Sequence, residues 1–261
     1  MGREVDREHF GHIEEARFRT RLEECLEALS HLLARPSFGA GERTLGAECE
    51  VFLIGARGRP LPLNHEVLAE SRDPRFDVEL DRFNLECNLR PAPLAGRPFT
   101  DLANQLHEAL SELGRAAATQ GGRIIAIGIL PTLTGADMTT EAISEIARYR
   151  VLERSLLARR REPFRVMIRG EEELQVDSES VALEGANTSL HLHLRVEPDE
   201  FSALFNAVQL ASARACRGGQ LAALARAPSV ARDARGFVQA GDGRPRRRSP
   251  GASRGRSRLA W

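Results

Sequence analysis

Two glutamates stand two residues apart in a stretch where apolar and other side chains alternate. Within residues 44–54, the odd positions from Leu45 to Leu53 are apolar, and Glu48 and Glu50 occupy two of the even positions. A period of two predicts a β-strand whose successive side chains point to opposite faces. The two carboxylates would lie about 6–7 Å apart on one face and repel each other. Such a pair suits either open solvent or the binding of cations.

A second acidic stretch alternates in the same way along residues 83–91. Its polar face carries Glu86, Asn88 and Arg90. Glu79 lies an odd number of residues before Glu86, so a flat strand would put these two carboxylates on opposite faces. A bend or bulge near residues 81–82 would bring both to one site.

Two histidines alternate with leucines in a third stretch, residues 188–196. His191 and His193 share one face of this predicted strand, and Leu190, Leu192 and Leu194 share the other. A lone histidine on a strand is usually structural. Two imidazoles on one polar face, in a chain with two carboxylate-bearing strands, favour a sheet that binds cations.

These three stretches, in this order, resemble the motifs of the glutamate–cysteine ligase superfamily, which are ATP-dependent carboxylate–amine ligases. The resemblance rests on Glu48 and Glu50 in Gly-x-Glu-x-Glu, on Glu79 and Glu86 in Glu-Leu-(x)5-Glu-x-Asn, and on the following His-x-His strand. Residues 127–132 and the pair Arg148-Tyr149 are also similar to that family. The resemblance covers about residues 14–212.

The resemblance implies a cytoplasmic ligase of glutathione biosynthesis with Mg²⁺ or Mn²⁺ as cofactor. ATP would phosphorylate the side-chain carboxylate of glutamate, and an amine such as cysteine would then attack the acyl phosphate. The implied metal ligands are Glu48, Glu50, Glu79, Glu86, His193 and, as the second choice of imidazole, His191. The implied substrate or nucleotide contacts are Asn88, Arg90, Arg148 and Tyr149. No catalytic residue is assigned.

The implied fold is α+β: a bent, mostly antiparallel sheet with flanking helices, similar to glutamine synthetase but incomplete. We expect residues 1–40 to form a helical segment that packs on the ligase domain, residues 41–213 to form a partial catalytic domain, and residues 214–261 to form a tail. Apolar spacing predicts a helix over about 14–34, one capped by Thr100-Asp101, one that runs from Thr139 or Thr140 through Leu156, and one after Pro198. It also predicts a strand buried on both faces over residues 124–130 and a hairpin around residues 170–173.

The tail differs in composition from the rest of the chain. Residues 214–261 contain 12 of the 37 arginines and only two of the 37 acidic residues. A segment this poor in patterned apolar residues cannot offset the entropy of ordering it, which predicts disorder. The resemblance implies a structured second half at this point, so we expect a truncated or frame-shifted chain. An inactive ligase-like protein is therefore one alternative, and a protein whose basic tail binds nucleic acid is a less favoured one.

Composition limits the remaining possibilities. A chain of 261 residues with 42% hydrophobic residues can form one large domain with its own core. No run of about 20 apolar residues predicts a membrane span. The four cysteines include no Cys-x-x-Cys pair and fit a reducing cytoplasm. The chain has no lysine, which excludes a phosphate loop of the Walker type.

Overall fold

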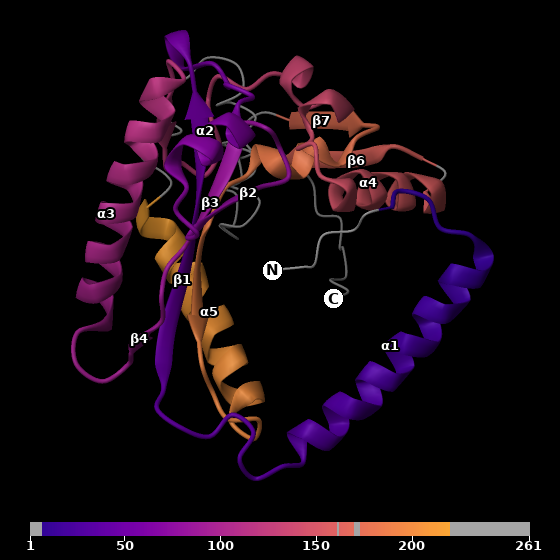
Figure 1. The fold of residues 1–261 in the computed structure, drawn as a ribbon, viewed down its shortest axis with the longest axis vertical. Helices are drawn as coiled ribbons and strands as arrows, with labels where there is room; N and C mark the ends of the chain where they lie inside the picture. The colour runs from indigo at the N-terminus through magenta and orange to yellow at the C-terminus, as the bar shows by residue number, and fades with distance from the viewer. Residues whose placement is uncertain (1–6, 161, 170–172, 220–261) are drawn as a thin grey trace, which may run out of the picture.

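A computed structural model describes residues 7–160, 162–169 and 173–219, and this part of the chain forms an α+β fold (Figure 1). Its helices are α1 (His12–Leu33), α2 (Asn64–Ser71), α3 (Pro98–Thr119), α4 (Ala147–Arg159) and α5 (Phe201–Gly219). Its strands are β1 (Thr44–Ile54), β2 (Phe76–Val78), β3 (Asn84–Asn88), β4 (Ala92–Pro93), β5 (Arg123–Ile125), β6 (Phe164–Arg169), β7 (Glu173–Ser178) and β8 (Leu190–Leu194). The predicted α+β class with a mostly antiparallel sheet is confirmed. The predicted start of the tail at residue 214 is wrong, since residues 214–219 belong to α5; the rest of the predicted tail, residues 220–261, lies outside the described residues.

The long strand β1 is paired along both of its edges. One edge pairs with β4 at residues 44–45 and with β3 at residues 48–52, and the other pairs with β8 at residues 45–49 and with β5 at residues 52–54. All of these pairs are antiparallel, and β2 extends the sheet beyond β3. Four segments distant in the sequence are thus aligned against one strand.

One face of this sheet is the main hydrophobic core. The odd-numbered side chains of β1 and β3 are buried there, as their alternation predicts. Helix α3 lies along this face (Figure 1), because its buried residues repeat at helical spacing. They are Leu102, Ala109, Leu113, Ala116 and Ala117. Buried Cys49 and Cys87 are register partners within this core, so they fill space on the side opposite the acidic residues.

The other face of β1 changes character along its length. At its C-terminal end, Phe52 stacks on Phe83 with ring centroids 6.1 Å apart, within a second apolar cluster. Towards its N-terminal end the same face carries Glu50, Glu48 and Gly46. Because this part of the face is not covered by apolar side chains, Glu48 and Glu50 are only half-buried.

The predicted strand over residues 124–130 is wrong in length and burial, since β5 covers only Arg123–Ile125 and its isoleucines are partly exposed. The backbone of β1 gives the reason. The N–H of Glu50 donates to the carbonyl of Ser189 at 2.9 Å, so the approach to β8 occupies the edge that a longer β5 would need. The apolar run turns away and its Gly128 carbonyl accepts from the N–H of Thr188 instead.

Two predicted helix starts are also wrong. Helix α3 begins at Pro98, whose fixed φ suits the first helical position, and Asp101 lies in its first turn. Residues 140–142 form only a short 3-10 turn, and α4 begins at Ala147. The residues between are extended, because the N–H of Ser144 donates to the carbonyl of Leu80 and joins this segment to the β2–β3 connection.

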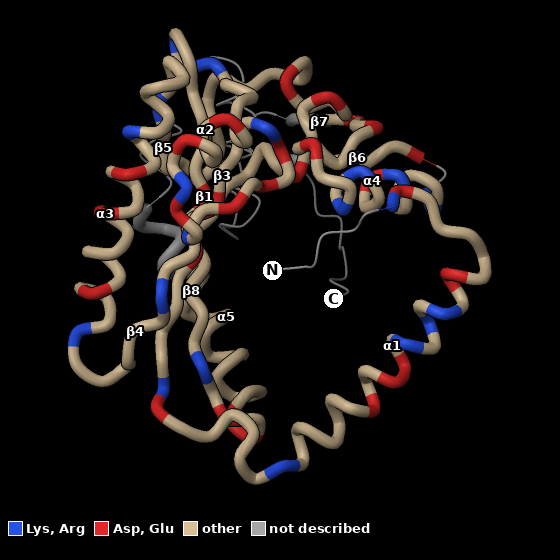
Figure 2. Tube along the Cα trace, in the orientation of Figure 1, with Lys and Arg blue, Asp and Glu red and all other residues tan. Residues whose placement is uncertain are grey.

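Helix α1 stands apart from the sheet as a separate rod (Figure 1). The predicted packing of residues 1–40 on the rest of the fold finds no support in α1, which has no buried residue. Its apolar side chains are exposed, as are several on β8 and α5. Along α1, a stretch of basic residues lies between two acidic stretches (Figure 2).

Polar contacts hold the two ends of α1. Before the helix, Glu8 pairs with Arg150 at 2.5 Å and with Arg154 at 3.2 Å, both on α4. After the helix, the Arg195 guanidinium donates to the carbonyls of Ala40 and Glu42. The position of α1 therefore depends on charged side chains at its ends.

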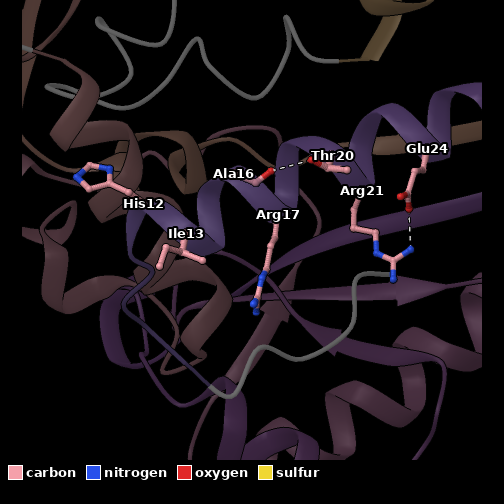
Figure 3. Close-up of a pocket in the computed structure, with 7 residues that line it drawn as sticks. All are labelled: His12, Ile13, Ala16, Arg17, Thr20, Arg21 and Glu24. Atoms are coloured by element: carbon pink, nitrogen blue, oxygen red, sulfur yellow. Dashed lines mark hydrogen bonds and ion pairs between the residues drawn. The ribbon is translucent and has the colours of Figure 1, made fainter.

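The side of α1 drawn in Figure 3 lines an open hollow of about 690 Å³. Its described lining residues are His12, Ile13, Ala16, Arg17, Thr20, Arg21 and Glu24. Because all of them belong to one helix, the hollow lacks the convergent walls of a ligand site. Within the described ranges, no helix combines the length and the apolar character that crossing a membrane requires.

A leucine-to-alanine substitution should lower stability strongly in the sheet core and hardly at all on α1. Leu85→Ala should lower the free energy of unfolding by about 2–5 kcal/mol, because it leaves a cavity in the core. Leu29→Ala, on the exposed face of α1, should change it by about 0.5 kcal/mol or less. Denaturant titration followed by circular dichroism measures both values. An equally large loss in the α1 variant would show that the helix packs on other residues.

Candidate functional site

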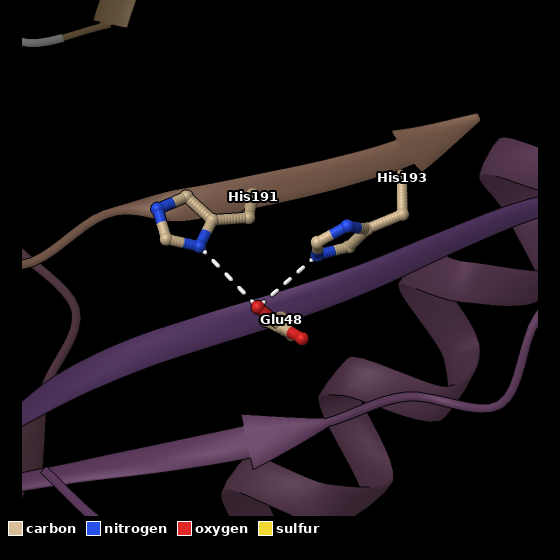
Figure 4. A group of neighbouring side chains, drawn as sticks. All are labelled: Glu48, His191 and His193. Carbon is tan, nitrogen blue, oxygen red and sulfur yellow. Dashed lines mark hydrogen bonds and ion pairs between the residues drawn. The ribbon is translucent and has the colours of Figure 1, made fainter. Parts of the chain in front are cut away.

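Glu48 and the two strand histidines form a compact three-residue cluster (Figure 4). The Oε2 atom of Glu48 lies 3.3 Å from Nδ1 of His191 and 3.1 Å from Nε2 of His193. The imidazole rings are perpendicular, with centroids 6.2 Å apart. The side chains of Glu48, His191 and His193 are 31%, 51% and 56% exposed, so the cluster opens to solvent.

The pairing of β8 with β1 builds this cluster. Glu48 is the register partner of His191, and Gly46 is the partner of His193. A side chain at Gly46 would begin 3.7 Å from the Cβ atom of His193. A side chain there would therefore make ordinary contact with His193, and the His193 ring reaches Glu48 as its diagonal neighbour across the strand pair.

Ser189 orients His191 from the other side of the ring. Its hydroxyl oxygen lies 2.7 Å from Nε2 of His191, which is the ring nitrogen that points away from Glu48. The backbone N–H of Ser189 also donates to Oε2 of Glu50 at 2.8 Å. One residue therefore connects the histidine cluster to the next carboxylate on β1.

The charge state of Glu48 reflects these neighbours. Partial burial raises its pKa, but hydrogen bonds from His193 and His191, with the attraction of their positive charges, outweigh that effect. The net result is a pKa below the usual value for glutamate. Glu48 is therefore an anion at neutral pH, ready to accept a proton or a cation from either side.

The remaining carboxylates gather beside this cluster. Glu50 is the register partner of Glu86, and the chain reversal between β2 and β3 brings Glu79 to Glu86. Burial, followed by a hydrogen bond with Glu86 and the negative charges of Glu50 and Glu86, raises the pKa of Glu79 to about 7, although the backbone N–H of Leu80 lowers it. Glu79 and Glu86 therefore lie together. The predicted bend or bulge near residues 81–82 is the chain reversal that joins β2 to β3.

Polar and basic groups border the carboxylates. Asn88 donates to Oε1 of Glu86 at 2.5 Å. On α4, the Arg148 guanidinium contacts the hydroxyl of Tyr149 at 3.0 Å and lies 4.7 Å from its ring centroid. Burial and the charge of Glu79 raise the pKa of Tyr149 to about 12, which places this pair near Glu79. Arg90 is exposed, and only its backbone makes described hydrogen bonds, with Gln105.

Three residues in this region were missed by the sequence analysis. Ser189 orients His191, Glu184 is close enough to Glu50 for that charge to raise its pKa, and Asp81 is fully buried. Burial raises the pKa of Asp81 to about 9, and the charges of Glu184, Glu79 and Glu153 add to the effect. The alternation of Ser189 with the histidines was a usable signal. No periodic pattern marked Glu184, which lies in a 3-10 turn at Val181–Ala186.

Comparison with known proteins gives one partial relationship. A protein of Mycolicibacterium vanbaalenii named "Putative glutamate--cysteine ligase 2-2" is 35% identical to this chain over 91 residues. The match covers 34% of this chain and 24% of that protein, so the chain spans about a quarter of its relative's length. No family model matches the chain, and no solved structure matches it. The comparison supports a ligase-like relationship for part of the chain.

Asp81→Asn should stabilise the protein increasingly as the pH rises. The folded-state pKa of about 9 lies above the usual value of 3.8, so the folded chain keeps a proton that the unfolded chain loses. Between about pH 4 and pH 9, ionisation of Asp81 in the unfolded chain therefore lowers the stability of the wild type progressively. The variant, which has no carboxyl group at this position, is not affected. Denaturant titrations at pH 5, 7 and 9 should show an advantage for the variant that grows by a few kcal/mol. Exposed Asp101→Asn is the control, and an advantage independent of pH would contradict the prediction.

Proposed function

We propose that this chain carries the cation-binding sheet of an ATP-dependent carboxylate–amine ligase of the glutamate–cysteine ligase type. The observation that carries the proposal is the convergence of Glu50, Glu79 and Glu86 from three segments of the chain. The ordered sequence motifs and the partial match to a protein named as such a ligase support it. Glutamate, ATP and an amine such as cysteine are the proposed substrates.

Glu50, Glu79 and Glu86 have the donor chemistry that suits a hard divalent cation, and side-chain movement would have to bring their oxygens closer, since these do not all lie within 4.8 Å of one another. Carboxylate oxygens are the ligands that Mg²⁺ prefers, and Mn²⁺ accepts the same donors. The pKa of Glu79 is raised to about 7, first by burial and then by its neighbours Glu86 and Glu50, so a cation bound there would favour its charged form. Glu50, Glu79 and Glu86, with Glu48 at their border, would hold the ion. A bound Mg²⁺ would supply the positive charge that lets ATP and the glutamate carboxylate approach each other.

The residues of the chain itself would bind and orient the reactants. Arg148 has a guanidinium group near Glu79 and one buried nitrogen, Nε, without a hydrogen-bond partner. Guanidinium groups bind phosphate oxygens well, so Arg148 is the proposed contact for the transferred phosphoryl group. Asn88 holds Glu86 in place. The carboxylates act as ligands in this proposal, and none of them is a general base.

Glu86→Gln should weaken Mg²⁺ or Mn²⁺ binding about tenfold or more, because it removes one anionic donor. The same substitution should raise the melting temperature of the metal-free protein slightly, since it relieves repulsion among Glu50, Glu79 and Glu86. Isothermal titration calorimetry and thermal denaturation measure the two effects. Glu70→Gln, an exposed change of the same chemistry on α2, should change neither. Unchanged metal affinity in Glu86→Gln would refute this cation site.

We expect the 261-residue chain to join glutamate and cysteine very poorly. An acyl phosphate must be shielded from water or it hydrolyses, and the half-exposed side chains around Glu48 leave this part of the sheet open. Groups that hold the reactants and the transferred phosphoryl group in place commonly contribute orders of magnitude to the rate of such a reaction. Mass spectrometry of reactions with glutamate, cysteine, ATP and Mg²⁺ measures the product. Rapid formation of γ-glutamylcysteine would show that the open site is sufficient. If γ-glutamylcysteine forms slowly, the chain is better described as an inactive ligase-like protein.

A further inference from the structure

The six predicted metal ligands divide into two groups with different donor atoms. Glu50, Glu79 and Glu86 offer only oxygen, whereas the cluster in Figure 4 offers two imidazole nitrogens and one carboxylate oxygen. We propose that Glu48, His191 and His193 form a separate site for a borderline transition-metal ion such as Zn²⁺ or Co²⁺. This inference goes beyond the proposed ligase chemistry, because metal binding at this site requires no ATP or amino acid.

The distances in the cluster suit such an ion. Two ligands about 2.1 Å from Zn²⁺ and separated by the tetrahedral angle lie about 3.4 Å from each other. The Glu48 oxygen lies 3.1 Å and 3.3 Å from the two facing nitrogens, and the donor atoms all lie within 4.8 Å of one another. Small side-chain movements would place all three around one ion, and the exposed side would leave a position for water.

Ser189 gives His191 the second contact that metal-binding histidines usually have. A hydrogen bond from Nε2–H of His191 to the Ser189 hydroxyl would leave Nδ1 unprotonated on the side of Glu48. Such outer contacts fix the tautomer and the orientation of a ligating ring. The same contact also fits a protonated His191 that donates to both Ser189 and Glu48, and the metal titration distinguishes these two states.

The donor set also determines which ion is preferred. Imidazole binds Zn²⁺ and Co²⁺ well, while Mg²⁺ prefers oxygen ligands and keeps its bound water. A cluster with two nitrogens among three donors therefore selects against Mg²⁺. The neighbouring carboxylates, which lack nitrogen, have the opposite preference. Two ions of different chemistry could then bind to adjacent parts of one sheet face.

Co²⁺ titration of the full-length chain tests this proposal through the visible absorption of the bound ion, with Zn²⁺ competition as a second readout. A Cys25→Ser/Cys216→Ser background leaves only the thiols of Cys49 and Cys87, which are buried in the sheet core. His191→Ala/His193→Ala should weaken binding at least about 100-fold, and Ser189→Ala should weaken it about tenfold. The matched control is His65→Ala/His107→Ala, which also removes two exposed imidazoles and should keep full affinity.

Three results would overturn the proposal. They are an equal loss of affinity in the matched control, unchanged affinity in the His191→Ala/His193→Ala variant, and displacement of Co²⁺ by millimolar Mg²⁺. Circular dichroism melting of each variant separates loss of the site from loss of the fold. Glu86→Gln distinguishes this site from the proposed ligase site, because it should weaken Mg²⁺ binding while Co²⁺ binding at the histidines persists.

Discussion

Backbone pairing on both edges of β1 is the constraint on which the rest of the structure depends. A strand paired on one edge could present Glu48 and Glu50, but it could not bring partners to them from two directions. Here β3 brings Glu86 from one side, and β8 with its preceding residue brings His191 and Ser189 from the other. The ladder hydrogen bonds set the register, and the register sets which side chains face each other.

This arrangement concentrates negative charge at an energetic cost. Carboxylates that approach one another in a partly buried place repel, and the raised pKa values of Glu79 and Asp81 are the measure of that repulsion and of burial. Groups with strongly shifted pKa values cluster at functional sites more often than elsewhere. The apolar opposite face of the sheet, packed against α3, supplies the stability that allows such a surface to persist.

The sequence predicted local features well and long-range geometry poorly. The period of two located β1 at its observed bounds and assigned the odd side chains of β1 and β3 to the main core, because alternation follows directly from strand geometry. It did not show that Phe52 and Asn84 on the opposite face are buried as well. The alternation could not show that β5 would be short. The length of β5 depends on which segment pairs with the same edge of β1, and this is a long-range contact. The alternation also missed Glu184, which reaches the site through the path of a turn. The grouping of Glu48 with both histidines depends on the register of β8 against β1, which is a property of the paired strands.

The polar attachment of α1 makes ionic strength a structural variable for this protein. Salt screens interactions between exposed charges, with a Debye length of about 8 Å at physiological concentration. The Glu8 pairs with Arg150 and Arg154 are partly exposed, whereas the contacts within the sheet core are apolar. Added salt therefore loosens the attachment of α1 and leaves the sheet intact. The orientation of α1, whose apolar side chains are already exposed, therefore varies with buffer composition while the geometry of the candidate site is preserved.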